Sequence, residues 1–112
     1  MNIKKYYKNN GEVKKEILTN TSYLSDRELR VHCYTSADKD LIATDLEVDV
    51  YTLTNDYVKS YTVASIETIE ENDNFNEIMD LHRERLSVEK KKLFSYLKKH
   101  FHNVKLSEDY SQ

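Results

Sequence analysis

Apolar and polar side chains alternate through most of residues 28–69, and this alternation constrains the fold more than any other feature of the chain. A period of two sends successive side chains to opposite faces of a β-strand. Each alternating stretch therefore predicts a strand with one buried and one solvated face. The alternating stretches are 28–35, 42–54 and 57–69. Polar residues at 36–40 and Asn55-Asp56 separate them and favour turns, so we predict an antiparallel meander.

The hydrophobic pattern also predicts a strand register. A two-residue turn at Asn55 and Asp56 places apolar residues opposite apolar residues in the second hairpin. A slip of one residue would set valines against polar side chains. The predicted cross-strand pairs are Val48–Val63, Val50–Tyr61, Thr35–Ile42, Val31–Leu46 and Arg30–Glu47.

The first twenty residues are less regular. Residues 12–19 predict a further strand with Val13 and Ile17 on one face. Residues 1–10 show no clear period, and we expect a flexible arm or an edge strand there. The predicted sheet thus occupies residues 11–69.

After residue 74 the period changes to that of a helix. Apolar side chains from Phe75 to Phe101 fall on one narrow arc, which predicts an amphipathic helix over 74–102 and a tail over 103–112. Asn74, followed three residues later by Glu77, resembles a capping box. The arc is interrupted at Glu89, and a break with a new cap at Ser87 stays open as an alternative.

These elements predict a single α+β domain over residues 1–112. Its fold is an antiparallel four-stranded meander with one long C-terminal helix packed on one face.

Composition excludes several function classes. The chain of 112 residues has one glycine and no proline, so it cannot form a glycine-rich phosphate loop. The single Cys33 cannot form an internal disulfide, and no apolar run is long enough to span a membrane. We expect a cytoplasmic protein.

The candidate catalytic and metal-binding residues do not assemble into sites. His32 and Cys33 are adjacent on a strand and therefore point to opposite faces, which excludes direct activation of the thiol. His100 and His102 are two residues apart, whereas helical metal ligands usually stand four apart. We predict no enzyme, no cofactor and no metal.

Charge is sorted along the chain. Residues 21–80 contain four basic and fourteen acidic side chains, while residues 81–107 contain eight basic and two acidic ones. Acidic residues and an apolar group near the second turn share the solvated sheet face, which favours a protein interface. The predicted partner-binding residues are Glu47, Asp49, Tyr51, Leu53, Tyr34 and Val58.

These residues suggest a small interaction module that binds another protein, with a homodimer as a further possibility. Its most specific version is a phage or mobile-element accessory protein that inhibits a host nucleic-acid enzyme through its acidic surface. The alternative is a nucleic-acid-binding module that uses lysines of the C-terminal helix. Those lysines are Lys91, Lys92, Lys98 and Lys99. A membrane-surface helix is not expected, because the apolar arc is needed to cover the sheet.

Overall fold

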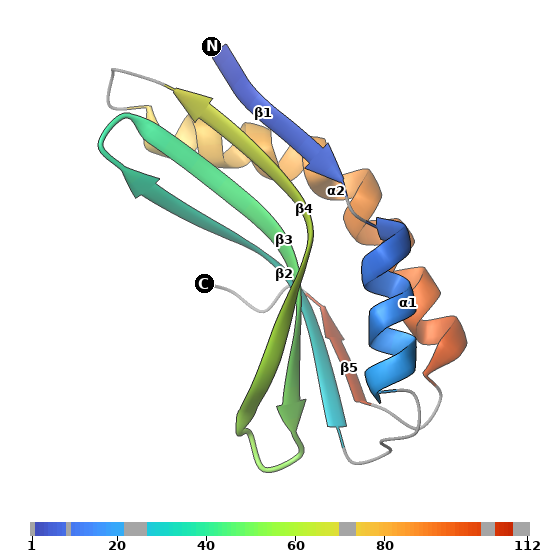
Figure 1. The fold of residues 1–112 in the computed structure, drawn as a ribbon. Coiled ribbons are helices and arrows are strands. Elements are labelled where there is room, and N and C mark those ends of the chain that lie inside the picture. The colour runs from blue at the N-terminus through green and yellow to red at the C-terminus, as the bar shows by residue number, and fades with distance from the viewer. Residues whose placement is uncertain (1, 9, 22–26, 70–73, 102–104, 109–112) are drawn as a thin grey trace.

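The computed structural model describes residues 2–8, 10–21, 27–69, 74–101 and 105–108, which form a five-stranded sheet with two helices on one face (Figure 1). In chain order, the elements are β1 (Asn2–Lys8), α1 (Asn10–Thr21), β2 (Arg27–Asp38), β3 (Leu41–Thr52), β4 (Tyr57–Ile69), α2 (Phe75–His100) and β5 (Lys105–Glu108). The strand order is β1-β4-β3-β2-β5. Every neighbouring pair is antiparallel except β2 and β5, which are parallel.

The fold is α+β, but the predicted four-stranded meander is wrong. Only β2, β3 and β4 form a meander, and residues 12–19 lie in α1 rather than in a strand. Val13 and Ile17 are both buried. A spacing of four residues places two side chains on one face of a strand and also on one face of a helix, so this pair alone could not decide between them.

The first hairpin is paired two residues away from the predicted register. Val31 pairs with Val48, and Asp38 pairs with Leu41 across a tight turn. In that turn, Lys39 has a φ of 57°. The strands extend into the segment that we expected to be a loop, which moves every pair by two residues. A shift of two leaves each side chain on its predicted face.

The second hairpin is also shifted, and it contains two irregularities. Val48 pairs with Tyr61 instead of Val63, because the loop between the paired Tyr51 and Tyr57 is longer than two residues. The register shifts once near this loop and again between Leu46 and Glu47. An extra residue in one strand reverses the alternation beyond it. Val63 and the adjacent Ala64 are therefore both fully buried.

Helix α2 is continuous through Ser87. The Ser87 hydroxyl donates to the Glu84 carbonyl inside the helix (2.7 Å) and does not cap a second one. At the start of α2, Asn74 occupies the N-cap position without a side-chain capping bond, so the predicted capping box does not form. The buried residues of α2 are Ile78, His82, Leu86, Glu89, Leu93 and Leu97.

The two charged or polar members of that buried row have partners on the sheet. Glu89, where the apolar arc is interrupted, lies 2.9 Å from the Lys8 Nζ of β1. The two ring nitrogens of His82 lie 2.9 Å from the hydroxyl of Thr44 and 2.7 Å from that of Thr68. The apolar arc of the helix is interrupted at Glu89 because Glu89 pairs there with Lys8 of β1, and not because the helix ends.

Both helices cover the same face of the sheet (Figure 1). Helix α1 lies beside the C-terminal half of α2, where Lys14 Nζ stands 4.6 Å from the centre of the Tyr96 ring. Within the described residues, no helix covers the other face of β2, β3 and β4. We call this the outer face.

Candidate functional site

The outer face carries a regular array of polar side chains. Strand β3 contributes an acidic residue at every second position. Its neighbours contribute hydroxyl groups from β4 and cationic or aromatic side chains from β2. The paired sets are Asp45, Glu47 and Asp49 on β3, Ser65, Thr62 and Ser60 on β4, and Tyr34, His32 and Arg30 on β2.

The centre of this array is a cluster of His32, Glu47 and Asp49, which we call the His32 cluster. The observed register places His32 directly opposite Glu47, and Asp49 follows two residues later on the same face. The His32 Nε2 atom lies 2.7 Å from Asp49 Oδ2 and 3.7 Å from Glu47 Oε1. His32 and Asp49 are buried, whereas Glu47 is half-buried.

A chain of hydrogen bonds supports Asp49 from β4. The Ser60 hydroxyl donates to Asp49 Oδ1 (2.6 Å), and the Tyr57 hydroxyl donates to the Ser60 Oγ (2.9 Å). The other carboxylate oxygen, Oδ2, is the one that faces His32. Asp49 is therefore oriented from both sides.

Glu47 is in a less favourable environment. Burial raises the pKa of its carboxyl, and the negative charge of Asp49 raises that pKa further. His32 acts in the opposite direction, but as a smaller cause. Two carboxylates thus share one imidazole in a place with limited access to water, where each charge is costly.

A second feature of the outer face is the end of the β3–β4 hairpin, residues 51–58, which we call the hairpin tip. Hydrogen bonds hold its loop in one shape: the Thr52 N–H donates to the Asp56 carbonyl (2.9 Å), and the Asn55 N–H donates to the Thr52 carbonyl (3.0 Å). The Asp56 N–H also donates to Thr52 Oγ1 (3.0 Å), and the Thr54 hydroxyl donates to Asp56 Oδ2 (3.0 Å). Asn55 has a φ of 71°, which asparagine tolerates better than most residues.

Large apolar side chains project from this ordered loop. Leu53 and Tyr57 are each 59% exposed, and Val58 is 48% exposed. In addition, the Arg30 guanidinium lies 3.7 Å from the centre of the Tyr51 ring, and Tyr51 meets Tyr57 edge-on at 5.7 Å. The tip therefore combines packed aromatic and cationic groups with exposed apolar side chains.

The structure brings together only some of the predicted partner-binding residues. Tyr51, Leu53 and Val58 lie at the hairpin tip. Tyr34 is exposed, but it pairs six residues away from the Tyr51 position, about 20 Å along the strands. Glu47 and Asp49 lie on the outer face as expected. However, the hydrogen bonds and burial of Asp49 remove it from the surface that a partner could reach.

The four predicted nucleic-acid-binding lysines, Lys91, Lys92, Lys98 and Lys99, are all exposed on α2. Their spacing of seven residues brings Lys98 almost above Lys91 and Lys99 almost above Lys92. They form two adjacent rows on the exposed side of α2, which together we call the lysine stripe.

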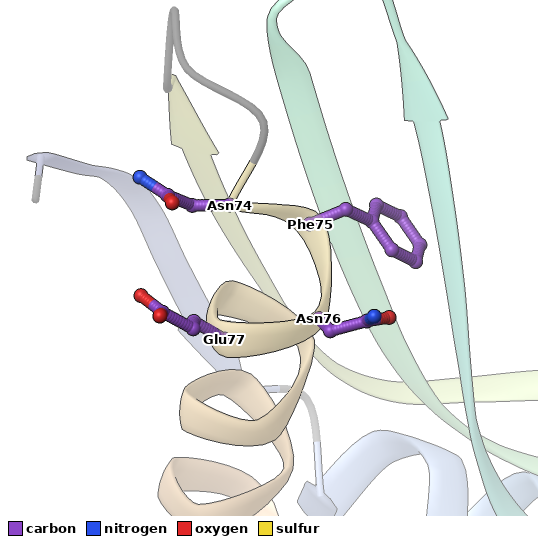
Figure 2. Close-up of a pocket in the computed structure, with 4 residues that line it drawn as sticks. All are labelled: Asn74, Phe75, Asn76 and Glu77. Atoms are coloured by element: carbon purple, nitrogen blue, oxygen red, sulfur yellow. The ribbon is translucent and has the colours of Figure 1, made fainter.

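A shallow pocket lies at the start of α2 and is lined by Asn74, Phe75, Asn76 and Glu77. Figure 2 shows that these side chains do not converge, because Phe75 and Asn76 point to one side of the helix and Asn74 and Glu77 to the other. A binding site needs polar groups that converge on a ligand. We assign no site to this pocket.

The other candidates from the sequence are placed as follows. Cys33 is buried in the core, and His100 is exposed at the end of α2. His102 lies outside the described residues. No helix in the described part of the chain is both long and apolar enough to cross a membrane.

Sequence reasoning missed the His32 cluster because it depends on the strand register. The predicted pairing set Arg30 against Glu47, whereas the observed pairing sets His32 there. The sequence did contain a signal, which is a pair of alternating motifs: Arg-x-His-x-Tyr on one strand and Asp-x-Glu-x-Asp on the next. Any register that keeps the valines buried places these two motifs on the same face of the sheet.

The fold and its outer face define the chain as a small α+β protein with a mixed five-stranded sheet over its described residues. No protein-family model, curated protein or solved structure matches it.

Proposed function

We propose that this chain is a small, non-catalytic interaction module that binds another protein through the hairpin tip. The observation that carries the proposal is the exposure of Leu53, Tyr57 and Val58 on a loop that its own hydrogen bonds hold in shape. Side chains that are already ordered lose less conformational entropy on binding, so their apolar area contributes more to affinity.

The composition of the tip supports this proposal. Tyrosine and arginine are enriched among the residues that contribute most to protein interfaces, and Tyr51, Tyr57 and Arg30 are in contact here. Leu53 is the residue that would enter an apolar cleft on the partner. The more specific idea, an acidic surface that imitates a phosphate backbone and inhibits a nucleic-acid enzyme, receives less support, because Asp49 is buried and hydrogen-bonded to His32 and Ser60.

The test compares two variants of the full chain in affinity capture from its native host. Leu53→Ser with Val58→Ser removes the exposed apolar groups of the tip. Val88→Ser is the matched control, because Val88 is 56% exposed on α2 and lies away from the tip. We expect one stoichiometric partner protein with the wild type and the control, and its loss with the tip variant.

Equal recovery from all three proteins would contradict the proposal. A second copy of the chain is the alternative occupant. Light scattering of the purified protein would reveal it as a dimer that the tip variant converts to a monomer.

A second candidate function, nucleic-acid binding, rests on the exposed lysine stripe of α2. Lysines at this spacing can follow phosphate groups without reading bases. Reversing the charge of Lys91, Lys92, Lys98 and Lys99 to glutamate would abolish binding to a labelled oligonucleotide, while arginine at the same positions would retain it. If the wild type does not bind, or if the glutamate variant binds equally, this candidate fails.

We further propose a cytoplasmic location. The supporting observation is that this sequence has a single cysteine, Cys33, which lies buried in the core and has no second cysteine to form a disulfide with, a pattern that suits a reducing compartment.

A further inference from the structure

The His32 cluster has a donor set that the proposed interaction does not use. It presents one imidazole nitrogen and two carboxylate groups, and the atoms that would bind an ion lie within 4.8 Å of one another. One nitrogen and two oxygen donors suit first-row transition ions better than Mg²⁺ or Ca²⁺, which prefer oxygen alone. We propose that His32, Glu47 and Asp49 form a binding site for a divalent transition-metal ion, with Zn²⁺ as the ion that fits it best.

The distances are close to those of a tetrahedral site. Zinc binds nitrogen and carboxylate oxygen at about 2.0–2.2 Å, which places neighbouring donor atoms about 3.3 Å apart. The observed separations of His32 Nε2 are 2.7 Å to Asp49 and 3.7 Å to Glu47. To complete the geometry, the close contact between His32 and Asp49 would have to widen and the half-buried Glu47 would have to move nearer. Three protein ligands leave a fourth position for water.

The strand framework fixes the three donors. Glu47 and Asp49 are two residues apart on β3, the middle strand of the sheet, and His32 is held on the adjacent β2. Around them, the Ser60 hydroxyl orients Asp49 through Oδ1 and leaves Oδ2 toward the cluster. Such outer hydrogen bonds hold ligating carboxylates in position in metal sites.

The electrostatics of the cluster also favour a cation. Two carboxylates and one imidazole lie together in a largely buried place, with His32 and Asp49 buried and Glu47 half-buried. A divalent ion would compensate both negative charges. The competing explanation is a purely structural ion pair, in which His32 bridges the two carboxylates and no metal binds.

The two explanations make opposite predictions for Glu47→Gln. If the site binds zinc, this variant should lose the stabilisation that zinc provides. A structural ion pair predicts no zinc effect in either protein.

The experiment uses the untagged full chain, treated with chelator and then titrated with Zn²⁺ at about pH 7.5, because zinc binding weakens as the pH falls. We expect one ion per chain by calorimetry, a rise in the melting temperature, and a tetrahedral visible absorption spectrum with Co²⁺. Glu47→Gln and Asp49→Asn should each weaken zinc binding about tenfold or more.

Two control variants show whether binding is specific. Asp45→Asn changes the acidic residue next along the same face of β3, and His100→Asn removes an exposed imidazole. Both should bind zinc as the wild type does. The proposal is overturned if calorimetry shows no binding, or if binding survives in Glu47→Gln and Asp49→Asn. Circular dichroism confirms that each variant is folded.

Discussion

At the scale of single residues, His82 is held by a polar contact at each of its two ring nitrogens. It is fully buried between α2 and the sheet, and its two nitrogens contact the Thr44 and Thr68 hydroxyls. The Thr44 hydroxyl in turn lies 2.9 Å from that of Thr35. A neutral imidazole has one donor and one acceptor, and this arrangement satisfies both. His82 therefore links α2 to three strands through polar contacts inside an otherwise apolar layer.

This environment makes stability dependent on pH. Burial lowers the pKa of His82 below its usual 6.5, with a smaller contribution from Arg85. As the pH falls through the unfolded value, the unfolded chain takes up a proton that the folded protein does not, so the free energy of unfolding decreases. Stability should therefore be complete above about pH 7 and decline toward about pH 5.

The matched variant is His82→Gln. At pH 8 it should unfold in urea with a free energy lower by about 1–3 kcal/mol, because one threonine hydroxyl loses its partner. This deficit should shrink as the pH decreases, since only the wild type carries the titrating group. A deficit that stays constant from pH 8 to pH 5 would show that His82 is not responsible.

At the scale of elements, the hairpin turns set the registers that the hydrophobic pattern left open. The first turn places Lys39 at a φ of 57°, a conformation that costs a lysine more than a glycine. Lys39→Gly should therefore leave the protein equally stable or stabilise it by up to about 1 kcal/mol in urea unfolding, despite the greater freedom of glycine in the unfolded chain. Lys39→Val should destabilise it, and equal stability of the two variants would contradict the observed turn.

The continuity of α2 leads to another prediction. Leu86 is fully buried, while the adjacent Ser87 bonds only within the helix. Leu86→Ala should lower the free energy of unfolding by about 2–5 kcal/mol through cavity formation, whereas Ser87→Ala should change it by less than about 0.5 kcal/mol. A large loss with Ser87→Ala would indicate a capping role and a broken helix.

Some elements could be predicted from the sequence, and there are physical reasons why the others could not. Alternation identified the meander strands, and the 3.6 period identified α2, because burial on one side imposes those periods. Neither period identified α1, because the spacing of Val13 and Ile17 fits both a strand and a helix. The periods also did not identify β5, a four-residue strand that depends on its parallel pairing with β2. The apolar residues of the hairpin tip were predicted, but their separation from Tyr34 was not.

At the scale of the whole molecule, β3 is the centre of the sheet. It is paired along its length with β2 on one side and β4 on the other, whereas β1 and β5 each have one described neighbour. The core residues of β3, Leu46, Val48 and Val50, are also among the most buried in the chain. Stability should therefore be highest along β3 and lowest at the two outer strands.

Hydrogen exchange measures this distribution directly. We expect the amides of Leu46 and Val48 to exchange slowest, at rates governed by global unfolding, and those of β1 and β5 to exchange much faster through local opening. Similar protection of β5 and β3 would contradict the predicted order.

The two-residue difference between the expected and observed pairings has a consequence for folding. Either alignment of β2 with β3 buries the same valines and leucines. Hydrophobicity alone therefore makes the native ribbon and the misaligned ribbon nearly equal in stability. The turn distinguishes them, and the solvent side adds to that preference, because only the native alignment sets His32 opposite Glu47 and within 2.7 Å of Asp49. We therefore expect that replacing these polar side chains would narrow the free-energy gap between the native ribbon and the misaligned one.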